Sequence, residues 1–403
     1  MTIKLLIADT FSSRHLQALQ SLGCEVDYQP ELKAESLPQV IGQYQALIVR
    51  GKQVSATAIA AADRLAIILR AGAGVNTIDV AAASARGIFV SNCPGRNSIA
   101  VAELVFALLL AIDRRIPDNV AALRAHQWNK KEFSKADGLY GRSLGVVGVG
   151  SIGREVIRRA RAFGMPVWAW SRSLTVDTAE QLDARFCPDL DELLEQVDVA
   201  SLHVALTPQT RGLIDSRRLQ RMKPRAILIN TSRGEIVDMT ALREAVAGGR
   251  IRAGLDVFDP EPTGGSGAFA DPILDLPHLY GTHHIGASTE QAQEAIADEA
   301  VRIVSHYLRC GMVLNCVNLA SRTPASFQLI VRHYDRVGVL AFVMDQIRRA
   351  NINVEEVQNV IFDGATAASC RIQLDAEPTS DLLQTIRQGN ADIIQLELVR
   401  LNP

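Results

Sequence analysis

Short apolar runs alternate with amphipathic stretches through the first third of the chain. The runs at residues 4–8, 46–49, 65–69 and 88–90 are rich in Ile, Leu and Val, as strands buried on both faces of a parallel sheet are. The stretches between them, such as residues 13–22, have helical spacing and end at a glycine or a turn. This alternation predicts a parallel sheet that is covered by helices on both faces.

A second series of the same kind begins at Ser143, after an apolar helix predicted over about residues 98–112. Its strands are predicted at residues 144–147, 167–170, 199–203, 226–230, 254–258 and 279–282. Residues 259–277 are rich in proline and glycine, which indicates a long loop, and loops of that length in compact domains are usually functional. An amphipathic helix over residues 289–308 follows the second series.

The tail has a different pattern. After a predicted linker at residues 315–326, residues 327–403 show the order strand, helix, strand, strand, helix, strand of a ferredoxin-like fold. This segment contains no recognisable catalytic set, so binding or assembly is its expected role. The predicted fold class is therefore α/β, with two Rossmann-like parallel-sheet domains followed by a ferredoxin-like domain.

Composition excludes several classes of function. The 403 residues suggest roughly two to four domains, and the net charge of -2 argues against a dedicated nucleic-acid-binding protein. The longest apolar run, residues 101–112, is too short to span a bilayer, and the first residues lack a signal-peptide pattern. The six cysteines are scattered, as is typical of reduced thiols. We therefore expect a cytoplasmic protein without membrane contact.

A glycine fingerprint follows the first strand of the second series. Gly148, Gly150 and Gly153 have the Gly-x-Gly-x-x-Gly spacing, and with Ser151 and Ile152 they open an amphipathic helix. The glycines allow a tight turn, close approach of the backbone to a pyrophosphate and close packing of helix on strand. The start of the helix offers unpaired amide donors to phosphates. This context predicts a dinucleotide-binding site.

The next strand leaves the choice between NAD and NADP open. An acidic residue that would bind the ribose hydroxyls of NAD is expected near its end, but the sequence there is Ser171-Arg172-Ser173. Arg172 and the flanking hydroxyls could hold a 2′-phosphate, which favours NADP. If Arg172 only stacks on the adenine, NAD also fits.

Three further residues supply the groups that hydride transfer to a carbonyl requires. Arg233 follows an apolar strand, at the edge where ligands bind in open parallel sheets. Its guanidinium can bind a carboxylate and polarise a ketone. His284 is a natural proton donor and acceptor, and Glu261 is a natural partner to orient it. Each could instead be an ordinary surface or strand-end residue, so the hypothesis depends on their joint occurrence. No metal site is predicted, because no flanking residues at ligand spacing complete one with His283 and His284.

Taken together, these motifs resemble the D-2-hydroxyacid dehydrogenase family, and most closely its members that oxidise D-3-phosphoglycerate. The likeness covers essentially residues 1–315, and the tail resembles the ACT regulatory domain. The motifs are the fingerprint, Arg233-Gly234, Asp256-Val257-Phe258 with Glu261-Pro262, residues 284–289, and the substrate loops at residues 70–76 and 92–98.

The resemblance implies a layout and a reaction. A flavodoxin-like substrate domain would comprise residues 1–95 and 285–315, an NAD(P)-binding domain residues 96–284, and an ACT domain residues 327–403. Arg233 would bind the substrate carboxylate, and His284 with Glu261 would transfer the proton. The other expected substrate-binding residues are Arg50, Arg70, Ala73, Gly74, Val75 and Asn97. The other expected cofactor-binding residues are His203, Thr231 and Asp256.

The resemblance also implies partners and alternatives. The substrate would be a small anionic 2-hydroxy or 2-keto acid, and the chain would form a homodimer or homotetramer. An amino-acid effector could bind the ACT domain at His333, Asp335 and Asn353, although a purely structural role for this part is an equal alternative. Two other functions stay open at this point, an NADPH-dependent glyoxylate or hydroxypyruvate reductase and a non-catalytic dinucleotide sensor.

Overall fold

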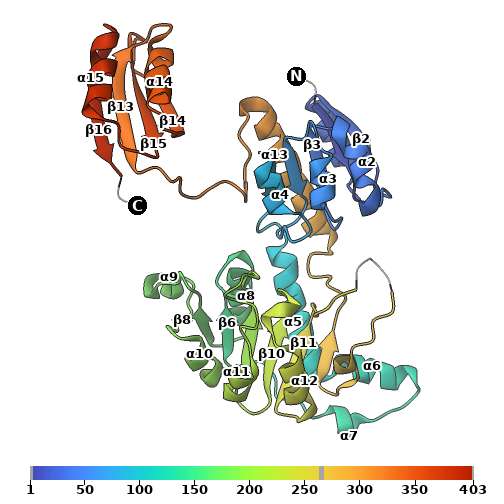
Figure 1. The fold of residues 1–403 in the computed structure, drawn as a ribbon. Helices are drawn as coiled ribbons and strands as arrows, with labels where there is room; N and C mark the ends of the chain where they lie inside the picture. The colour runs from blue at the N-terminus through green and yellow to red at the C-terminus, as the bar shows by residue number, and fades with distance from the viewer. Residues whose placement is uncertain (1–2, 263–266, 402–403) are drawn as a thin grey trace. The chain divides into compact units, whose positions relative to one another are not determined.

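The computed structural model describes residues 3–262 and 267–401 and divides into two compact units (Figure 1). The first unit is Met1–Asn318 and the second is Leu319–Pro403. The first unit contains two parallel sheets, and the second contains a four-stranded antiparallel sheet. The fold class predicted from the apolar pattern is therefore confirmed. Within the described ranges, no helix has the length and apolar character needed to cross a membrane.

The first sheet has the strand order β2-β1-β3-β4-β5, which is the flavodoxin-like order. All four residues of β3 are buried, because helices cover both faces. The strands are β1 (Ile3–Ile7), β2 (Cys24–Tyr28), β3 (Ala46–Val49), β4 (Ile67–Arg70) and β5 (Phe89–Asn92). The helical segments are α1 (Ser13–Ser21), η1 (Ala34–Ser36), α2 (Leu37–Val40), η2 (Ile41–Gln43), α3 (Ala56–Ala60) and α4 (Val80–Ala85).

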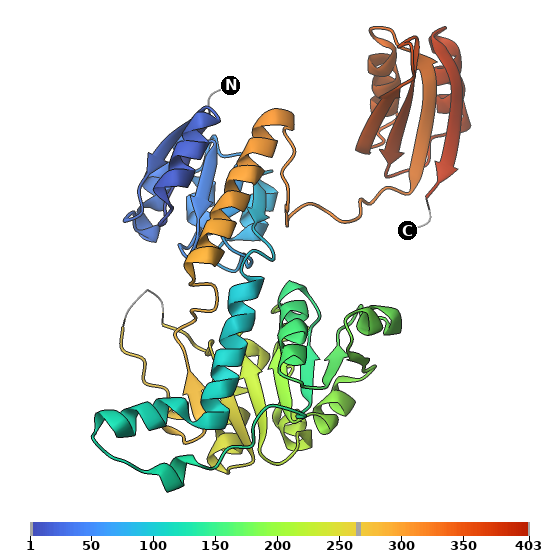
Figure 2. The same ribbon diagram turned by 180° about the vertical axis from the view of Figure 1, so that it is seen from behind.

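A helix from far along the chain completes this first core. Helix α13 (Glu290–Cys310) packs beside α1, and Figure 2 shows it lying along the first sheet. Its residues Ile296, Ala300 and Ile303 are buried in the same apolar cluster as Leu5 and Ile48. The chain therefore returns to its first sheet after building the second one.

The second sheet has seven parallel strands in the order β12-β11-β10-β9-β6-β7-β8. The chain runs outward from β6 in both directions, so the order reverses there, and ligands bind at such a switch point in open sheets. The strands are β6 (Leu144–Val147), β7 (Val167–Trp170), β8 (Arg185–Phe186), β9 (Val199–Leu202), β10 (Ala226–Asn230), β11 (Ile251–Leu255) and β12 (Leu279–Gly281).

Helices α5 and α8 pack on one another, and α5 also covers β10 and β11. A Cβ atom at Gly254 would lie 3.0 Å from Ile112 Cδ1, so a glycine in β11 allows α5 to approach the sheet closely. The helical segments of this part are α5 (Ser98–Arg114), α6 (Ile116–Arg124), α7 (Lys130–Phe133), α8 (Ser151–Ala162), α9 (Val176–Gln181), α10 (Leu190–Gln196), α11 (Ser216–Arg221), η3 (Gly234–Ile236), α12 (Met239–Ala247) and η4 (Pro272–Asp275).

One predicted strand was placed wrongly. Strand β11 begins at Ile251 and ends at Leu255, not at residues 254–258, because the charged residue Arg252 does not interrupt it. Arg252 is buried, and its guanidinium donates to Asp137 Oδ2 at 3.0 Å and to Arg225 O. A buried charge with such partners is tolerated inside a strand. The edge strands β2 and β8 were not predicted, since they lack a continuous apolar run.

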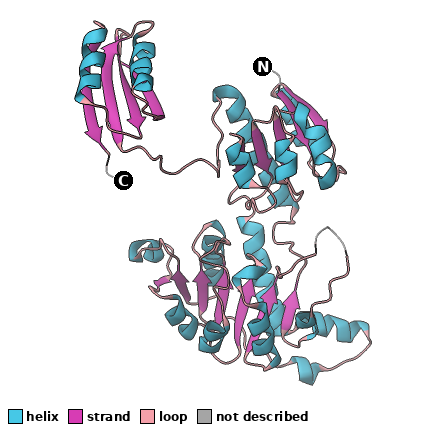
Figure 3. Cartoon of the chain, viewed as in Figure 1, coloured by secondary structure: helices cyan, strands magenta, loops and turns pink. Residues whose placement is uncertain are grey.

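The tail unit consists of one sheet with helices (Figure 3). Its strand order is β14-β15-β13-β16, and alternate residues of β13 are buried. Both of its helices pack on the buried face in one apolar cluster. The elements are β13 (Phe327–Tyr334), α14 (Val339–Arg349), β14 (Val354–Ile361), β15 (Ala367–Leu374), α15 (Ser380–Gly389) and β16 (Ile393–Arg400). The two larger sheets lie within one unit, so the boundaries expected at residues 95 and 284 stay a prediction.

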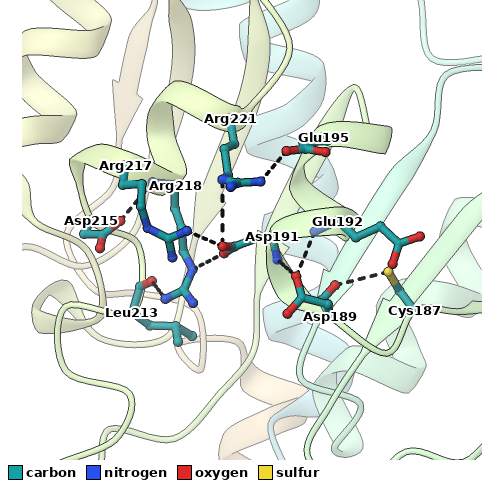
Figure 4. A network of polar contacts seen from close by, with 10 residues as sticks. All are labelled: Cys187, Asp189, Asp191, Glu192, Glu195, Leu213, Asp215, Arg217, Arg218 and Arg221. Carbon is teal, nitrogen blue, oxygen red and sulfur yellow. Dashed lines mark hydrogen bonds and ion pairs between the residues drawn. The ribbon is translucent and has the colours of Figure 1, made fainter.

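A network of charges joins helices α10 and α11 at the surface (Figure 4). Asp191 accepts hydrogen bonds from Arg218 Nε at 2.6 Å and from Arg217. Burial alone would raise the pKa of Asp191, but these hydrogen bonds outweigh it and lower the pKa. The network fixes the two helices against each other and includes no residue of the fingerprint loop, so we assign it a structural role.

A second network fastens α13 to the loop before α5. Glu299 is 3% exposed and accepts hydrogen bonds from Arg302 Nη2, Arg96 Nη2 and Asn315 Nδ2 at 2.6, 2.6 and 2.8 Å. These hydrogen bonds lower the pKa of Glu299 to about 2, and the bond from Arg302 contributes most, although burial of the carboxylate opposes the shift. One carboxylate therefore connects segments that are some 200 residues apart in the sequence.

We expect Glu299→Gln to lower the free energy of unfolding by about 3 kcal/mol at pH 7, because the pKa falls from 4.5 to about 2 and one pKa unit corresponds to about 1.4 kcal/mol. The folded-state pKa lies below the unfolded value, so this stabilisation is complete above about pH 4.5 and is lost as the pH falls toward 2. Thermal unfolding of the wild type and of Glu299→Gln between pH 7 and pH 3 measures this difference in the free energy of unfolding.

The control is Glu294→Gln, on the same helix, whose carboxylate is 38% exposed and pairs only with Arg14 among the described residues. It should change the free energy of unfolding by less than about 1 kcal/mol. A difference between wild type and Glu299→Gln that is the same at pH 7 and pH 3 would contradict the assignment.

Candidate active site

The fingerprint loop joins β6 to α8 at the switch point of the second sheet. Gly148 has a φ of +100°, and a Cβ there would lie 2.6 Å from His203 O. A Cβ at Gly153 would lie 2.1 Å from Gly148 O, so the helix packs on the turn more closely than a side chain allows. At Gly150, by contrast, a Cβ would meet no atom of the described residues within 4 Å. The loop thus leaves space in front of the backbone amides that open α8.

Buried polar atoms without partners lie in the segments around this loop. Within the described ranges, Asn97 Oδ1, Thr231 Oγ1 and His203 Nδ1 have no hydrogen-bond partner although they are shielded from solvent. Native proteins rarely leave such atoms unsatisfied, and a bound ligand is one explanation. All three residues were expected to bind substrate or cofactor. The loop and these atoms fit a dinucleotide.

His203 is held as a neutral imidazole. Its Nε2 lies 2.8 Å from Ser201 Oγ, and burial lowers the pKa of His203 to about 3. Nδ1 and Nε2 can therefore exchange hydrogen bonds with hydroxyls without adding a positive charge beside the fingerprint.

The end of β7 carries Ser171 and Arg172 beside the fingerprint strand. Residues 171–174 form a turn in which Leu174 N donates to Ser171 O at 3.1 Å. Arg172 is exposed and forms no ion pair or hydrogen bond with another described residue. The first carboxylate that follows, Asp177, lies in the first turn of α9. The strand end therefore offers a free guanidinium where a ribose-binding acid would stand.

The structure brings His284 and Glu261 together. His284 Nδ1 lies 2.8 Å from Glu261 Oε2, while Glu261 Oε1 accepts a hydrogen bond from Phe258 N at 3.1 Å. Burial raises the pKa of Glu261, but the contact with His284 outweighs this effect and lowers it. With Nδ1 turned to the carboxylate, Nε2 is the ring nitrogen available for proton transfer.

Asp256 lies directly after β11 and behind this pair. It is completely buried, and its main-chain oxygen accepts a hydrogen bond from His284 N at 2.8 Å. Its expected role in placing the nicotinamide remains a prediction.

Arg233 lies between the second sheet and the substrate loop. Its Nη1 donates to Ser232 O at 2.6 Å, and its Nη2 lies 3.4 Å from Asn76 Oδ1. A Cβ at Gly74 would lie 2.6 Å from Nη2, so the loop approaches this guanidinium closely at Gly74, and the expected roles of Ala73 and Val75 stay predictions. The side chain of Asn92 fixes the loop by donating to Ala73 O.

Two more arginines add positive charge to the same edge. Arg70 Nε donates to Arg50 O at 2.9 Å. Burial, and next the positive charges of Arg233 and Arg50, lower the pKa of Arg70. Like charges that are held together in this way are stabilised by an anion, so the cluster of Arg50, Arg70 and Arg233 is a candidate anion site.

A cavity of about 270 Å³ opens beside Arg50. It lies at the carboxyl ends of β1, β3 and β4 and against the start of α13. Its polar lining includes Thr10, Ser12 and Gln293 together with the carboxylates Glu290 and Glu294. The sequence pattern did not indicate these lining residues. They come from distant segments, and none has a motif, so only the pairing of α13 with the first sheet could identify them.

The effector candidates in the tail unit do not meet within one chain. His333 and Asp335 lie at the end of β13, whereas Asn353 directly precedes β14. Val354 at the start of β14 and Phe327 at the start of β13 both pair with Leu374 of β15, so Asn353 lies near the start of β13. The two ends of β13 are seven residues apart, which corresponds to about 23 Å in a strand. His333 is also only 1% exposed. Within the described residues, no group of three or more His, Cys, Asp or Glu side chains forms a metal site.

Comparison with known proteins identifies the family. Residues 106–286 match the NAD-binding domain of the D-isomer-specific 2-hydroxyacid dehydrogenases. The chain is 34% identical over 402 residues to D-3-phosphoglycerate dehydrogenase of Methanocaldococcus jannaschii, covering 99% of this chain and 75% of that protein. It spans somewhat less than two thirds of the length of other curated relatives.

Solved structures agree with this assignment. A Thermus thermophilus protein superposes with a TM-score of 0.70 at 36% identity, covering 78% of this chain and all of that one. The NADPH-dependent glyoxylate/hydroxypyruvate reductase of Sinorhizobium meliloti superposes with a TM-score of 0.69 at 27% identity, covering 78% and 97%. Together with the fingerprint loop and the histidine–glutamate pair, these matches show that the chain belongs to the D-isomer-specific 2-hydroxyacid dehydrogenases, which are NAD(P)-dependent oxidoreductases.

Proposed function

We propose that the protein oxidises D-3-phosphoglycerate to 3-phosphohydroxypyruvate, the first step of phosphorylated L-serine biosynthesis. The observation that carries the proposal is the cluster of Arg50, Arg70 and Arg233 at the substrate loop, which supplies local positive charge in a chain of net charge -2. A substrate with both a carboxylate and a phosphate matches such a cluster. The relatives named D-3-phosphoglycerate dehydrogenase support this choice.

Each residue of the candidate site has a role in this reaction. Arg233 binds the carboxylate and polarises the carbonyl oxygen that forms. His284 takes the hydroxyl proton at Nε2, and Glu261 stabilises the resulting imidazolium through Nδ1. NAD(P), when bound, accepts the hydride. Arg50 and Arg70, at the carboxyl ends of β3 and β4, hold the phosphate.

The cofactor is held by the fingerprint loop, with His203 and Thr231 nearby. Within the NAD(P) class, the free guanidinium of Arg172 beside Ser171 favours NADP, because it can pair with a 2′-phosphate. The same feature supports the second candidate function, an NADPH-dependent reductase of glyoxylate or hydroxypyruvate, as in the similar Sinorhizobium meliloti enzyme. A non-catalytic dinucleotide sensor is disfavoured by the paired His284 and Glu261.

The remaining parts of the proposal concern assembly and location. We propose a cytoplasmic homodimer or homotetramer in which α6 contacts another copy, because Ile116, Val120 and Leu123 are exposed on it. An amino-acid effector that uses both ends of β13 requires two copies of the tail unit, since His333 and Asn353 lie far apart in one chain.

His284→Ala should lower kcat by about 10²–10⁴-fold, the usual contribution of a general base. Binding of NADH or NADPH, followed by fluorescence, should change little, since the fingerprint loop is intact. Full activity in this variant would remove the proposed mechanism.

Turnover with phosphorylated and unphosphorylated 2-hydroxy acids distinguishes the two candidate enzymes. Arg50→Ala and Arg70→Ala should each reduce kcat/KM for D-3-phosphoglycerate by about 10–100-fold, the equivalent of one charged hydrogen bond. They should leave kcat/KM for glycerate nearly unchanged. Arg64→Ala, an exposed arginine of the same part, is the control. Equal losses on both substrates would favour the reductase.

Arg172→Ala tests the choice of cofactor. The loss of a charge-assisted bond to the 2′-phosphate should weaken NADPH binding about tenfold or more and leave NADH binding unchanged. Dissociation constants from nucleotide fluorescence measure both effects. Arg243→Ala, an exposed arginine on α12, serves as the control. Equal affinities of the wild type and the Arg172 variant for NADPH would contradict the preference for NADP.

A further inference from the structure

The carboxyl group of Asp256 binds the segment that carries His284 at three points. Asp256 Oδ1 accepts hydrogen bonds from Thr282 Oγ1 at 2.6 Å and from Ile285 N at 2.8 Å. Asp256 Oδ2 accepts one from Gly286 N at 2.8 Å. With the bond from His284 N to Asp256 O, one residue holds both sides of the histidine.

His284 needs this support because its backbone is strained. Its φ is +53°, in the left-handed region that residues with side chains rarely adopt. Such conformations persist where the surroundings impose them, and they gather at functional sites. In this conformation the peptide N–H groups of Ile285 and Gly286 face Asp256 and donate to its two carboxyl oxygens.

Gly286 shows how closely the segment is drawn in. A Cβ at this position would lie 3.0 Å from Asp256 Oδ2. Asp256 itself is completely buried, and three of its roughly four acceptor positions are already used within the described residues. The carboxyl group is therefore committed to one side-chain hydroxyl and two backbone N–H groups of the segment 282–286.

We propose that Asp256 is a positioning residue, which holds residues 282–286 so that His284 keeps its left-handed conformation and its contact with Glu261. Glu261 follows Asp256 by five residues and is fixed by Phe258 N, so the segment 256–261 holds both members of the pair. A shift of about 1 Å at a reacting group can cost about 100-fold in rate. This inference rests on the proposed dehydrogenase function and assigns Asp256 a role other than contact with the nicotinamide.

Asp256→Asn tests the inference, because an amide replaces one acceptor with a donor that faces a backbone N–H. We expect kcat to fall about 10–100-fold, while KM for the hydroxy acid and the dissociation constant of NADH change less than threefold. Thr282→Val, which removes one donor and keeps the shape of the side chain, should lower kcat less, by about threefold to tenfold. Asp275→Asn, an exposed carboxylate before β12, is the control and should match the wild type.

A crystal structure of Asp256→Asn gives a readout that does not depend on activity. We expect His284 to leave the left-handed region and its Nδ1 to move beyond hydrogen-bond distance of Glu261. An unchanged contact between His284 and Glu261 would overturn the inference, and so would an NADH affinity that falls by the same factor as kcat. If Asp256→Asn does not fold, the same measurements are made on Thr282→Val. A wild type without turnover on any 2-hydroxy acid would refute the proposed function instead, and the crystal structure would still decide the role of Asp256.

Discussion

The 2.8 Å contact between His284 and Glu261 is the interaction on which the proposed chemistry depends. It commits one ring nitrogen to a carboxylate and leaves the other to exchange a proton. Both residues lie on segments that follow adjacent parallel strands, β11 and β12, so the twist and register of the second sheet bring them together. The parallel sheet thus serves as a rigid frame for a site made of loops.

The chain as a whole is nearly neutral, but three arginines gather at one place in the fold. Arg50 follows β3 and Arg70 ends β4 in the first sheet, and Arg233 lies after β10 of the second. Their mutual repulsion is a cost of folding, which an anionic substrate offsets when it binds. In the proposed function, a substrate with two anionic groups binds where the two sheets present their carboxyl ends to each other.

Networks of buried polar groups hold this arrangement in place. Glu299 ties α13 to the loop that leads into α5, and through it the returning helix to the start of the second sheet. Such fully bonded carboxylates specify one arrangement of segments better than apolar contacts alone, because each requires particular donors at particular distances. The long-range fold and the local geometry of the site therefore depend on the same kind of interaction.

The local sequence pattern was sufficient to predict the fold class and the dinucleotide loop of this protein. Apolar runs buried on two faces identify parallel strands, and glycine spacing between a strand and a helix identifies the dinucleotide loop, because both signals lie within a few residues. The pattern failed where a charge is paired at long range, as Arg252 is inside β11. Residues from distant segments meet only once the chain has folded. The cavity beside Arg50, the separation of His333 from Asn353 and the support that Asp256 gives to His284 were therefore decided by packing between segments, which leaves no periodic trace in the sequence.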